Sequence, residues 1–371
     1  MGELAVASGY ILAYRFFEVA YEIDLSKAEQ LWAEQQRPAS SRARLTATPP
    51  KAVAFGVSPL DLALDPIPLE LDGAESLATV GVRLYDFGVI SIALRISADG
   101  LSWSGFADRA NAVDRQVGSA RNSDIWNQLL ARVKRDLNLA LTRAEEPILE
   151  EDYLVAVVNT FSEPVTATAL QQRADLVPLL SGERRPLSEA ARHDLLRQRF
   201  SYYTDDLVAL TWDRAFIYEP RGDSDVLGVL EVANAQLLEM RYYDALLDGE
   251  LPRMYDLVEA TRRTAALFAA RRFAKLARQL YTLVAEVTEL TEKVDNALQV
   301  TEDVYLARVY AAALDLFRVH AVSAGVDRKL AIIRDTYAAL YDEASGSRSE
   351  LLEIAILVLI LLEVVLPLFR H

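Results

Sequence analysis

The sequence predicts an α+β protein made of two similar α/β halves, a long antiparallel helical hairpin and a C-terminal transmembrane helix. Three observations predict this class. Strand-like and helical runs follow one another in the same order twice before residue 249. Residues 255–298 contain no glycine or proline and carry seven-residue apolar repeats. Residues 351–369 hold only two charges. We therefore expect four parts, at residues 1–147, 148–249, 250–346 and 347–371.

Composition restricts the function. The 371 residues include 39 basic and 54 acidic side chains, and 39 − 54 gives a net charge of −15. This balance argues against nucleic acid as the main partner of the whole molecule, because Lys and Arg drive phosphate binding. Cysteine is absent, which excludes disulfides, thiolate metal sites and a cysteine nucleophile. The N-terminus lacks the basic-then-apolar order of a secretory signal, so we expect no targeting presequence.

The first half begins with a strand rich in aromatic and aliphatic residues. In chain order the expected elements are a strand at 10–21, a helix at 24–36, a short strand at 52–57, a hairpin at 80–96 and a helix at 107–141. Asp24 is suited to cap the first helix. The hairpin turns at Asp86-Phe87-Gly88, because aspartate and glycine favour tight turns.

The second half repeats this order. Its expected elements are a strand at 153–161, a helix at 188–200 capped by Ser188, a hairpin at 207–218 turning near Asp213-Arg214, and a helix at 225–247. The acidic stretch 145–152 lies between the halves. We interpret the two halves as duplicated βαββα units of the ferredoxin-like kind.

Residues 250–346 predict a coiled-coil-like hairpin. Gly249 and Pro252 are suited to end one helix and begin the next. Apolar positions then recur every seven residues in two runs, at Leu280, Val287 and Val294 with Leu283, Leu290 and Ala297, and again over residues 309–340. Thr301 is a candidate cap between the two arms. Because apolar heptads require helical partners, we expect a homo-oligomer formed through this hairpin.

The C-terminal run predicts a membrane anchor. Its nineteen residues, 351–369, would form a helix about 28 Å long, close to the hydrocarbon thickness of a bilayer. The residues that define the span include Leu351, Leu352, Glu353, Ile354, Ile360, Glu363, Val364 and Phe369. Glu363 costs roughly 2.5–3.5 kcal/mol there, and the surrounding Leu, Ile and Val residues outweigh it. A buried bundle helix and an in-plane interfacial helix are the alternatives.

The same run carries a family resemblance. Residues 352–364, with Leu-Glu, an apolar stretch and then Glu-Val, resemble the C-terminal signature of the "required for meiotic nuclear division" family. Residues 85–90 are similar to that family's hairpin, and residues 231–239 stand in the place of its helix after the second hairpin. The resemblance implies a prokaryote-like member without a presequence, associated with a membrane and with its bulk on the cytoplasmic side. For the mitochondrial members it also implies a supporting role in translation.

No motif for chemistry stands out. The three histidines are scattered, and no Walker A loop, GxGxxG, HExxH or Gly-x-Ser-x-Gly pattern is present. We expect no cofactor, no metal, no small-molecule substrate and no catalytic residue. Two carboxylate groups remain as alternatives. Asp223-Ser224-Asp225 is either a cation site or a turn with a helix cap. Asp86 and Asp213 are either ordinary turn residues or an acid/base pair of a hydrolase or nuclease-like enzyme.

One helix carries a basic face. At 100° per residue, Arg271, Arg272, Lys275 and Arg278 fall within about 120° of one another. This face is suited to anionic lipid headgroups, to ribosomal RNA, or simply to water. The leading hypothesis from the sequence is a non-enzymatic, tail-anchored scaffold or tether with a cytoplasmic body. A ribosome- or RNA-associating factor at the membrane is an alternative.

Overall fold

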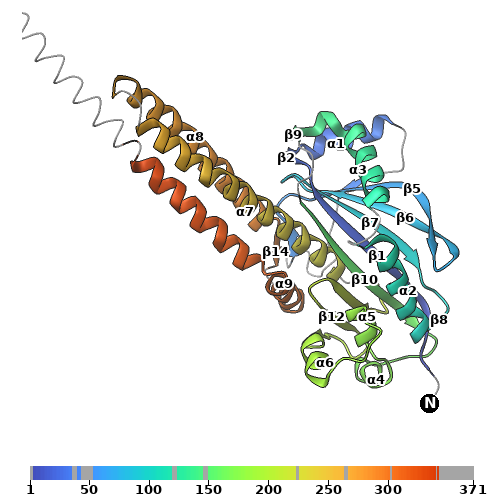
Figure 1. The fold of residues 1–371 in the computed structure, drawn as a ribbon. Coiled ribbons are helices and arrows are strands. Elements are labelled where there is room, and N and C mark those ends of the chain that lie inside the picture. Colours follow the sequence, from blue (N-terminus) through green and yellow to red (C-terminus); the bar gives the residue numbers. More distant parts are fainter. Residues whose placement is uncertain are drawn as a thin grey trace, which may run out of the picture. The chain divides into compact units, whose positions relative to one another are not determined.

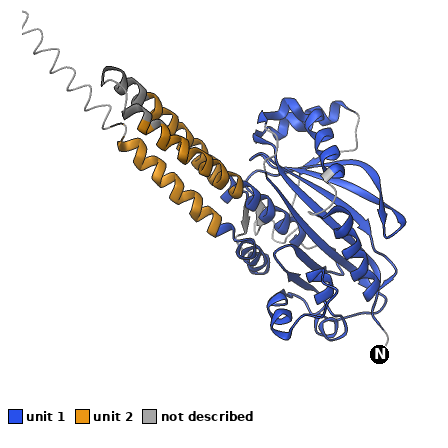
Figure 2. Ribbon diagram, in the orientation of Figure 1, with its two compact units in different colours: residues 1–239, 293–320 blue, residues 240–292, 321–371 orange. Residues whose placement is uncertain are grey.

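The computed structural model describes residues 3–35, 40–42, 53–118, 123–144, 149–222, 225–262, 266–300, 303–339 and 341. The chain is a mixed α+β protein with a large sheet and several C-terminal helices (Figure 1), which confirms the predicted class. It divides into two compact units (Figure 2). Unit 1 is Met1–Glu239 with Lys293–His320, and unit 2 is Met240–Glu292 with Ala321–His371. The four-part division expected from the sequence follows other boundaries and stays a prediction.

Unit 1 is built on one mixed sheet. Among the described residues its strand order is β11 (Gln198–Phe200), β12 (Leu207–Leu210), β13 (Arg214–Tyr218), β10 (Glu150–Phe161), β1 (Ala5–Glu18), β7 (Val89–Ser97), β6 (Ala74–Leu84), β5 (Leu60–Leu71) and β3 (Ser41–Arg42), with β8 (Leu101–Ser102) paired to β1. Two small sheets pair β2 (Ala20–Ile23) with β9 (Leu141–Ala144), and β4 (Val53–Phe55) with β14 (Leu298–Val300). The central strands β1 and β10 have nearly continuous buried runs, as expected when both faces of a sheet are covered.

The two halves of the sheet share an order of elements but differ in pairing. Each half has a central strand, then helical structure, then a three-stranded meander that ends beside the central strand. β7 runs antiparallel to β1, whereas β13 runs parallel to β10. The helical connection after β10 returns the chain to the end of the sheet at which β10 begins. As a result, β11 and β13 run in the same direction as β10. The structure therefore does not confirm a ferredoxin-like duplication.

The helices of the first half cover one face of the sheet. They are α1 (Leu25–Glu34), α2 (Trp103–Val117) and α3 (Ser123–Leu137), followed by a short 3-10 turn, η1 (Asn138–Ala140). Asp24 caps α1 as predicted, since its carboxylate accepts hydrogen bonds from the backbone N–H groups of residues 26 and 27. The single helix expected at 107–141 is instead two helices. Both helices bury apolar residues in the same core. The helical spacing of apolar residues in the sequence therefore did not reveal that α2 ends before Gly118.

The long helix α7 (Val226–Arg262) contradicts the predicted break near residue 250. It continues through Gly249 and Pro252, and it passes from unit 1 into unit 2 after Glu239. Proline inside a helix costs about 3 kcal/mol. Leu247 and Met254, on either side of it, are buried. Burial of each such side chain contributes roughly 1.5–3 kcal/mol, which offsets the cost of the proline in the helix.

In its described residues, unit 2 contains three helical segments, one more than the two arms of the expected hairpin. They are the second part of α7, most of α8 (Ala266–Asp295), and the helix Val319–Ala339 from Ala321 onward (Figure 2). The Lys329 ammonium lies 2.6 Å from a carboxylate oxygen of Asp244 on α7, and the rings of Tyr281 and Tyr337 are 5.9 Å apart. The heptad positions of this unit are buried within the single chain, among them Leu280, Val287, Leu290, Val326 and Ile333.

The expected second arm is also bent. α9 (Val304–Leu316) and the helix Val319–Ala339 meet at 61°. Arg318, between them, has a positive φ of 59°, a backbone conformation that ends a helix. Asp303 caps α9, because its carboxylate accepts from the backbone N–H of Leu306 at 2.9 Å. The predicted cap, Thr301, lies outside the described residues.

No described helix has by itself both the length and the apolarity that a membrane span requires, while the bent pair around Arg318 has them jointly, by length and composition alone. The predicted span at 351–369 lies outside the described residues.

A substitution in the turn between β6 and β7 tests how closely this turn packs. The turn is the one predicted from Asp86-Phe87-Gly88. Gly88 has a φ of +97°, and a Cβ there would lie 1.9 Å from the carbonyl oxygen of Ala20. Gly88→Ala should lower the free energy of unfolding by roughly 2–5 kcal/mol, from backbone strain plus steric overlap. Gly73→Ala is the matched control, because Gly73 has a φ of +82° with no atom within 4 Å of the added Cβ. Its expected loss is about 1–2 kcal/mol. Calorimetric melting of both variants measures the difference, and equal losses would contradict the close approach to Ala20.

Candidate functional site

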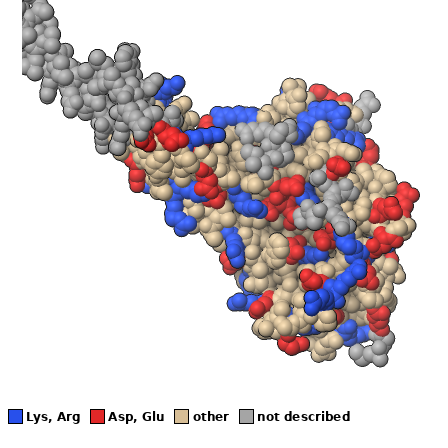
Figure 3. All heavy atoms as spheres, in the orientation of Figure 1, with Lys and Arg blue, Asp and Glu red and all other residues tan. Residues whose placement is uncertain are grey.

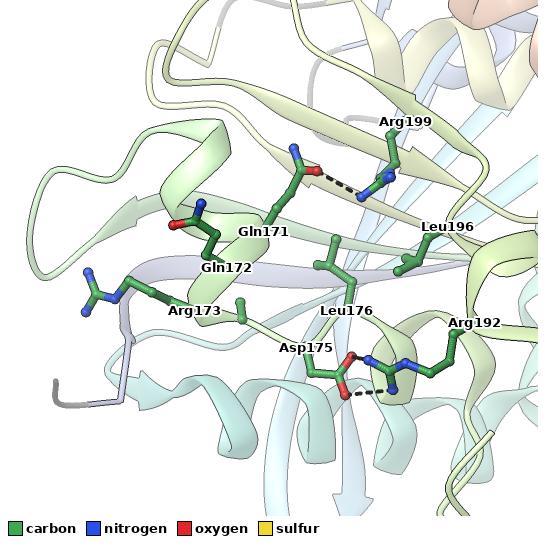
Figure 4. A pocket seen from close by; sticks show the side chains of 9 residues that line it. Gln171, Gln172, Arg173, Asp175, Leu176, Arg192, Leu196 and Arg199 are labelled. Atoms are coloured by element: carbon green, nitrogen blue, oxygen red, sulfur yellow. Dashed lines mark hydrogen bonds and ion pairs between the residues drawn. The ribbon is translucent and has the colours of Figure 1, made fainter. Parts of the chain in front are cut away.

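A cavity of about 300 Å³ opens in unit 1 among three short helices and the edge strand β11 (Figure 4). The helices are α4 (Ala167–Arg173), α5 (Val177–Ser181) and α6 (Glu189–Leu195). We call this cavity the arginine pocket. Its lining residues are Gln171, Gln172, Arg173, Ala174, Asp175, Leu176, Arg192, Leu196 and Arg199.

Side-chain hydrogen bonds support the start of each of these helices. The hydroxyl of Thr166 accepts from the backbone N–H of Ala169 at 3.2 Å, and that of Ser188 accepts from Ala191 at 3.3 Å. Ser188 is thus the cap predicted from the sequence. The residue before α5, Leu176, makes no side-chain cap, but the carboxylate of Asp175 accepts from the backbone N–H of Val177 at 3.1 Å. Helices of five to seven residues are not stable alone, so packing must hold them.

The packing comes from the core and from three side-chain hydrogen bonds. The indole N–H of Trp103 on α2 donates to the carbonyl of Asp175 at 3.1 Å. The hydroxyl of Tyr218 donates to the carbonyl of Val165 at 3.0 Å. The Arg214 guanidinium donates to the carbonyl of Leu179 at 2.9 Å. The buried residues of this region include Leu170, Leu176, Leu179 and Leu180. The pocket walls are therefore fixed to α2 and β13.

Arg214 is a structural arginine. Its side chain is 7% exposed, and its guanidinium lies 2.7 Å from both the amide oxygen of Asn111 and a carboxylate oxygen of Asp114. Gly182, with a φ of +67°, follows α5, and a Cβ there would lie 2.4 Å from this guanidinium. These contacts connect α2, α5 and β13, and they leave the charge of Arg214 paired inside unit 1.

The pocket has two polar sides. On one side the Arg192 guanidinium points at Asp175 and makes two hydrogen bonds of 3.2 Å to its carboxylate (Figure 4). On the other side Arg199 donates to the side-chain oxygen of Gln171 at 2.8 Å. Leu176 and Leu196 lie between the two pairs. At the rim, Arg173 pairs with Glu163 at 2.5 Å.

The charge of this segment is opposite to that of the chain. Residues 171–199 hold six arginines (Arg173, Arg184, Arg185, Arg192, Arg197, Arg199) and four acids (Asp175, Glu183, Glu189, Asp194), so 6 − 4 gives +2 against −15 for the whole sequence. Elsewhere acidic and basic side chains interleave over the face seen in Figure 3. Local arginine density was the one sequence signal for this site. It was missed because the lining residues are spread over α4, α6, β11 and the connections between these elements.

Asp86 and Asp213 lie at the two predicted hairpin turns, but the structure does not bring them together. Asp86 precedes β7 and Asp213 precedes β13, and β1 and β10 lie between those strands. Three interstrand spacings separate them by roughly 14 Å or more. Burial raises the pKa of Asp86, opposed by Lys293, and burial raises the pKa of Asp213, opposed by a hydrogen bond from Thr211. A carboxylate pair of a hydrolase needs the two groups much closer together.

The other candidate residues have simpler surroundings. Asp225 is 8% exposed and immediately precedes α7, as the helix-cap alternative expects; Asp223 and Ser224 lie outside the described residues. Within the described ranges, no group of three or more Asp, Glu or His is placed to hold a metal ion. On α8, Lys275 and Arg278 are exposed while Leu276 and Ala277 are buried. The structure does not describe the side chains of Arg271 and Arg272. The residues of the predicted span also lie outside the described ranges.

The half-buried carboxylate of Asp152, on β10, allows a pH test of the fold. Burial raises the pKa of Asp152 above its usual 3.8, opposed by Arg15. The folded state therefore keeps this proton to higher pH than the unfolded state, and ionisation above pH 3.8 destabilises the fold. Asp152→Asn removes that effect. Its free energy of unfolding, measured by urea titration and compared with wild type, should rise as pH increases above 3.8. A difference that falls over the same range would contradict the burial of this carboxylate.

Comparison with known proteins places the sheet and the pocket in a family. Residues 8–225 match the family model described as "Uncharacterized protein MJ0711, N-terminal domain". "Uncharacterized protein MJ0711" of Methanocaldococcus jannaschii is 25% identical over 221 residues, which are 59% of this chain and 66% of that protein. The chain thus spans slightly less than two thirds of the length of this relative. No solved structure matches.

The family match includes the arginine pocket and ends before α7. It does not reach residues 352–364, so the resemblance to the "required for meiotic nuclear division" family stays a prediction. The match covers more than half of the sequence, and the chain belongs to the family of the MJ0711 N-terminal domain.

Proposed function

We propose that this chain is a non-catalytic, tail-anchored scaffold or tether whose α+β body lies on the cytoplasmic side of a membrane. The observation that carries the proposal is the run at residues 351–369, with nineteen residues and two charges. As a helix it would be about 28 Å long, enough to cross the hydrocarbon core. The helices of unit 2 come before this run in the chain, and the last described one ends at Ala339.

Glu363 is the one expensive group in the middle of this run. A carboxylate near the centre of a span costs roughly 2.5–3.5 kcal/mol, unless it is protonated or paired. We propose that Glu363 is protonated or meets a second copy of the tail. The heptad residues of unit 2, such as Leu280 and Val326, are already buried within one chain. Self-association is therefore proposed through the tail rather than through the heptads.

The finer account of the fold also belongs to the proposal. The shared order of central strand, helical connection, three-stranded meander and helix supports an ancient duplication of the two halves. Since β7 is antiparallel to β1 while β13 is parallel to β10, the two halves must have come to differ in the connection that follows the central strand. The enzyme alternative loses its main support, because two strands, β10 and β1, separate the strands that Asp86 and Asp213 precede.

A second role is supported by the basic face of α8. Lys275 and Arg278 are exposed on that helix, and the sequence places Arg271 and Arg272 on the same face. A membrane-anchored protein brings such a face close to anionic headgroups, which attract each charge by about 1 kcal/mol. RNA phosphates would use the same charges.

The anchor is tested by alkaline carbonate extraction of membranes. Full-length protein should stay in the membrane pellet, while a chain truncated to residues 1–346 should be released, because only the first carries the apolar run. Immunoblots of pellet and supernatant measure both. Release of the full-length chain as complete as that of the truncation would exclude the anchor.

The basic face is tested by hydrogen–deuterium exchange of the full-length protein in nanodiscs. Amides of α8 around Lys275 and Arg278 should exchange more slowly with phosphatidylglycerol than with phosphatidylcholine. Arg278→Gln should reduce this protection, since one charge contributes about 1 kcal/mol, or about five-fold in binding. Thr288→Glu is the control, because it changes the net charge equally at an exposed position of α8 outside the basic face. Protection that appears only when RNA is added would favour the RNA alternative, and none in either case would remove this role.

A further inference from the structure

Arg199 has binding capacity that the chain itself does not use. A guanidinium has five N–H donors and a permanent positive charge. Within the part of the chain that the structure describes, Arg199 donates one hydrogen bond, to the neutral amide of Gln171. It projects from β11, which is paired to β12 in the main sheet. An uncompensated guanidinium on a fixed strand at a cavity is suited to an anion.

The opposite side of the pocket offers acceptors instead. Arg192 neutralises Asp175 through two hydrogen bonds, and Val177 holds the same carboxylate by its backbone N–H. A carboxylate has about four acceptor positions, so Asp175 retains capacity for a further donor. Hydroxyl groups of a ligand are donors of this kind. The two sides therefore favour different ends of one molecule (Figure 4).

The size and floor of the pocket indicate an organic body. Leu176 is buried and Leu196 half-buried between the two polar sides, so Leu196 offers a small apolar area to the carbon atoms of a ligand. A volume of about 300 Å³ is at the lower end for small-molecule sites and exceeds what a bare phosphate fills. The local charge of +2 favours entry of an anion into an otherwise acidic protein.

We infer that the arginine pocket binds a small hydroxylated organic anion of the sugar-phosphate type. Its anionic group is held by Arg199 with the amide of Gln171, and its hydroxyl groups are held by Asp175. This inference is independent of the membrane anchor, because every residue that it uses lies in unit 1. It departs from the sequence-based expectation of no small-molecule ligand.

Calorimetric titration of the full-length protein in detergent tests the inference with three probes. Ribose 5-phosphate should bind saturably and more tightly than inorganic phosphate, and ribose alone should give no signal. Arg199→Gln should weaken the binding of both anions by about ten-fold or more, because it removes the charged donor. Arg197→Gln is the matched control, since Arg197 is exposed two residues earlier and does not line the pocket. It should leave the affinity unchanged.

Three results would overturn the inference: no saturable binding of ribose 5-phosphate, equal losses in the Arg197 and Arg199 variants, or equal affinity for inorganic phosphate and ribose 5-phosphate. Phenylglyoxal labelling of the wild-type protein keeps the test valid if Arg199→Gln fails to fold. Mass spectrometry should then show that ribose 5-phosphate protects Arg199 and leaves Arg197 reactive. Labelling of Arg199 that ribose 5-phosphate does not change would equally refute the site.

Discussion

The antiparallel pairing of β1 with β10 is the constraint on which the rest of unit 1 depends. These strands pair in one uninterrupted register from Gly9 opposite Val158 to Phe17 opposite Glu150, and they join the meander that ends in β7 to the meander that ends in β13. A shift of one residue would turn every side chain of one strand to the opposite face of the sheet, where different residues pack against it. The pairing thereby fixes β13, and with it Arg214, whose hydrogen bond to Leu179 holds α5 at the arginine pocket.

A partly buried ion network fixes α7 on the other face of the sheet. Arg83 on β6 lies 2.6 Å from a carboxylate oxygen of Asp61 on β5 and 2.7 Å from one of Glu231 on α7. Burial raises the pKa of Glu231, and the Arg83 charge opposes that rise. Loss of either partner would leave an unpaired buried charge, which is among the most destabilising changes in a protein core. The start of α7 is therefore tied to the sheet by polar contacts as well as by apolar packing, and this helix continues as the first segment of unit 2.

Local chemistry made part of the fold predictable from the sequence. Asp24 and Ser188 are caps, and the turns at Gly88 and Asp213 join hairpins, because each depends on a few neighbouring residues. β5 was missed because it contains Pro66 and Pro68; its pairing with β6 has an irregularity between Leu64 and Ile67, where a missing donor is tolerated. The pocket was not predicted because Asp175, Arg192 and Arg199 meet only after α4–α6 fold against α2 and β13. The residues of each turn were enough to predict that the turn exists. The separation of Asp86 and Asp213 depends on the order of the strands in the sheet, which local sequence does not determine.

The proposal that the tail crosses a membrane and leaves the body on the cytoplasmic side can be measured directly because the sequence contains no cysteine. Single substitutions Ser347→Cys and His371→Cys, one at each end of the apolar run, give each variant one thiol for a membrane-impermeant maleimide. Applied to sealed vesicles of known orientation, the reagent should label Ser347→Cys only from the cytoplasmic side and His371→Cys only from the opposite side. Labelling of both positions from the same side of the membrane would contradict the transmembrane tail.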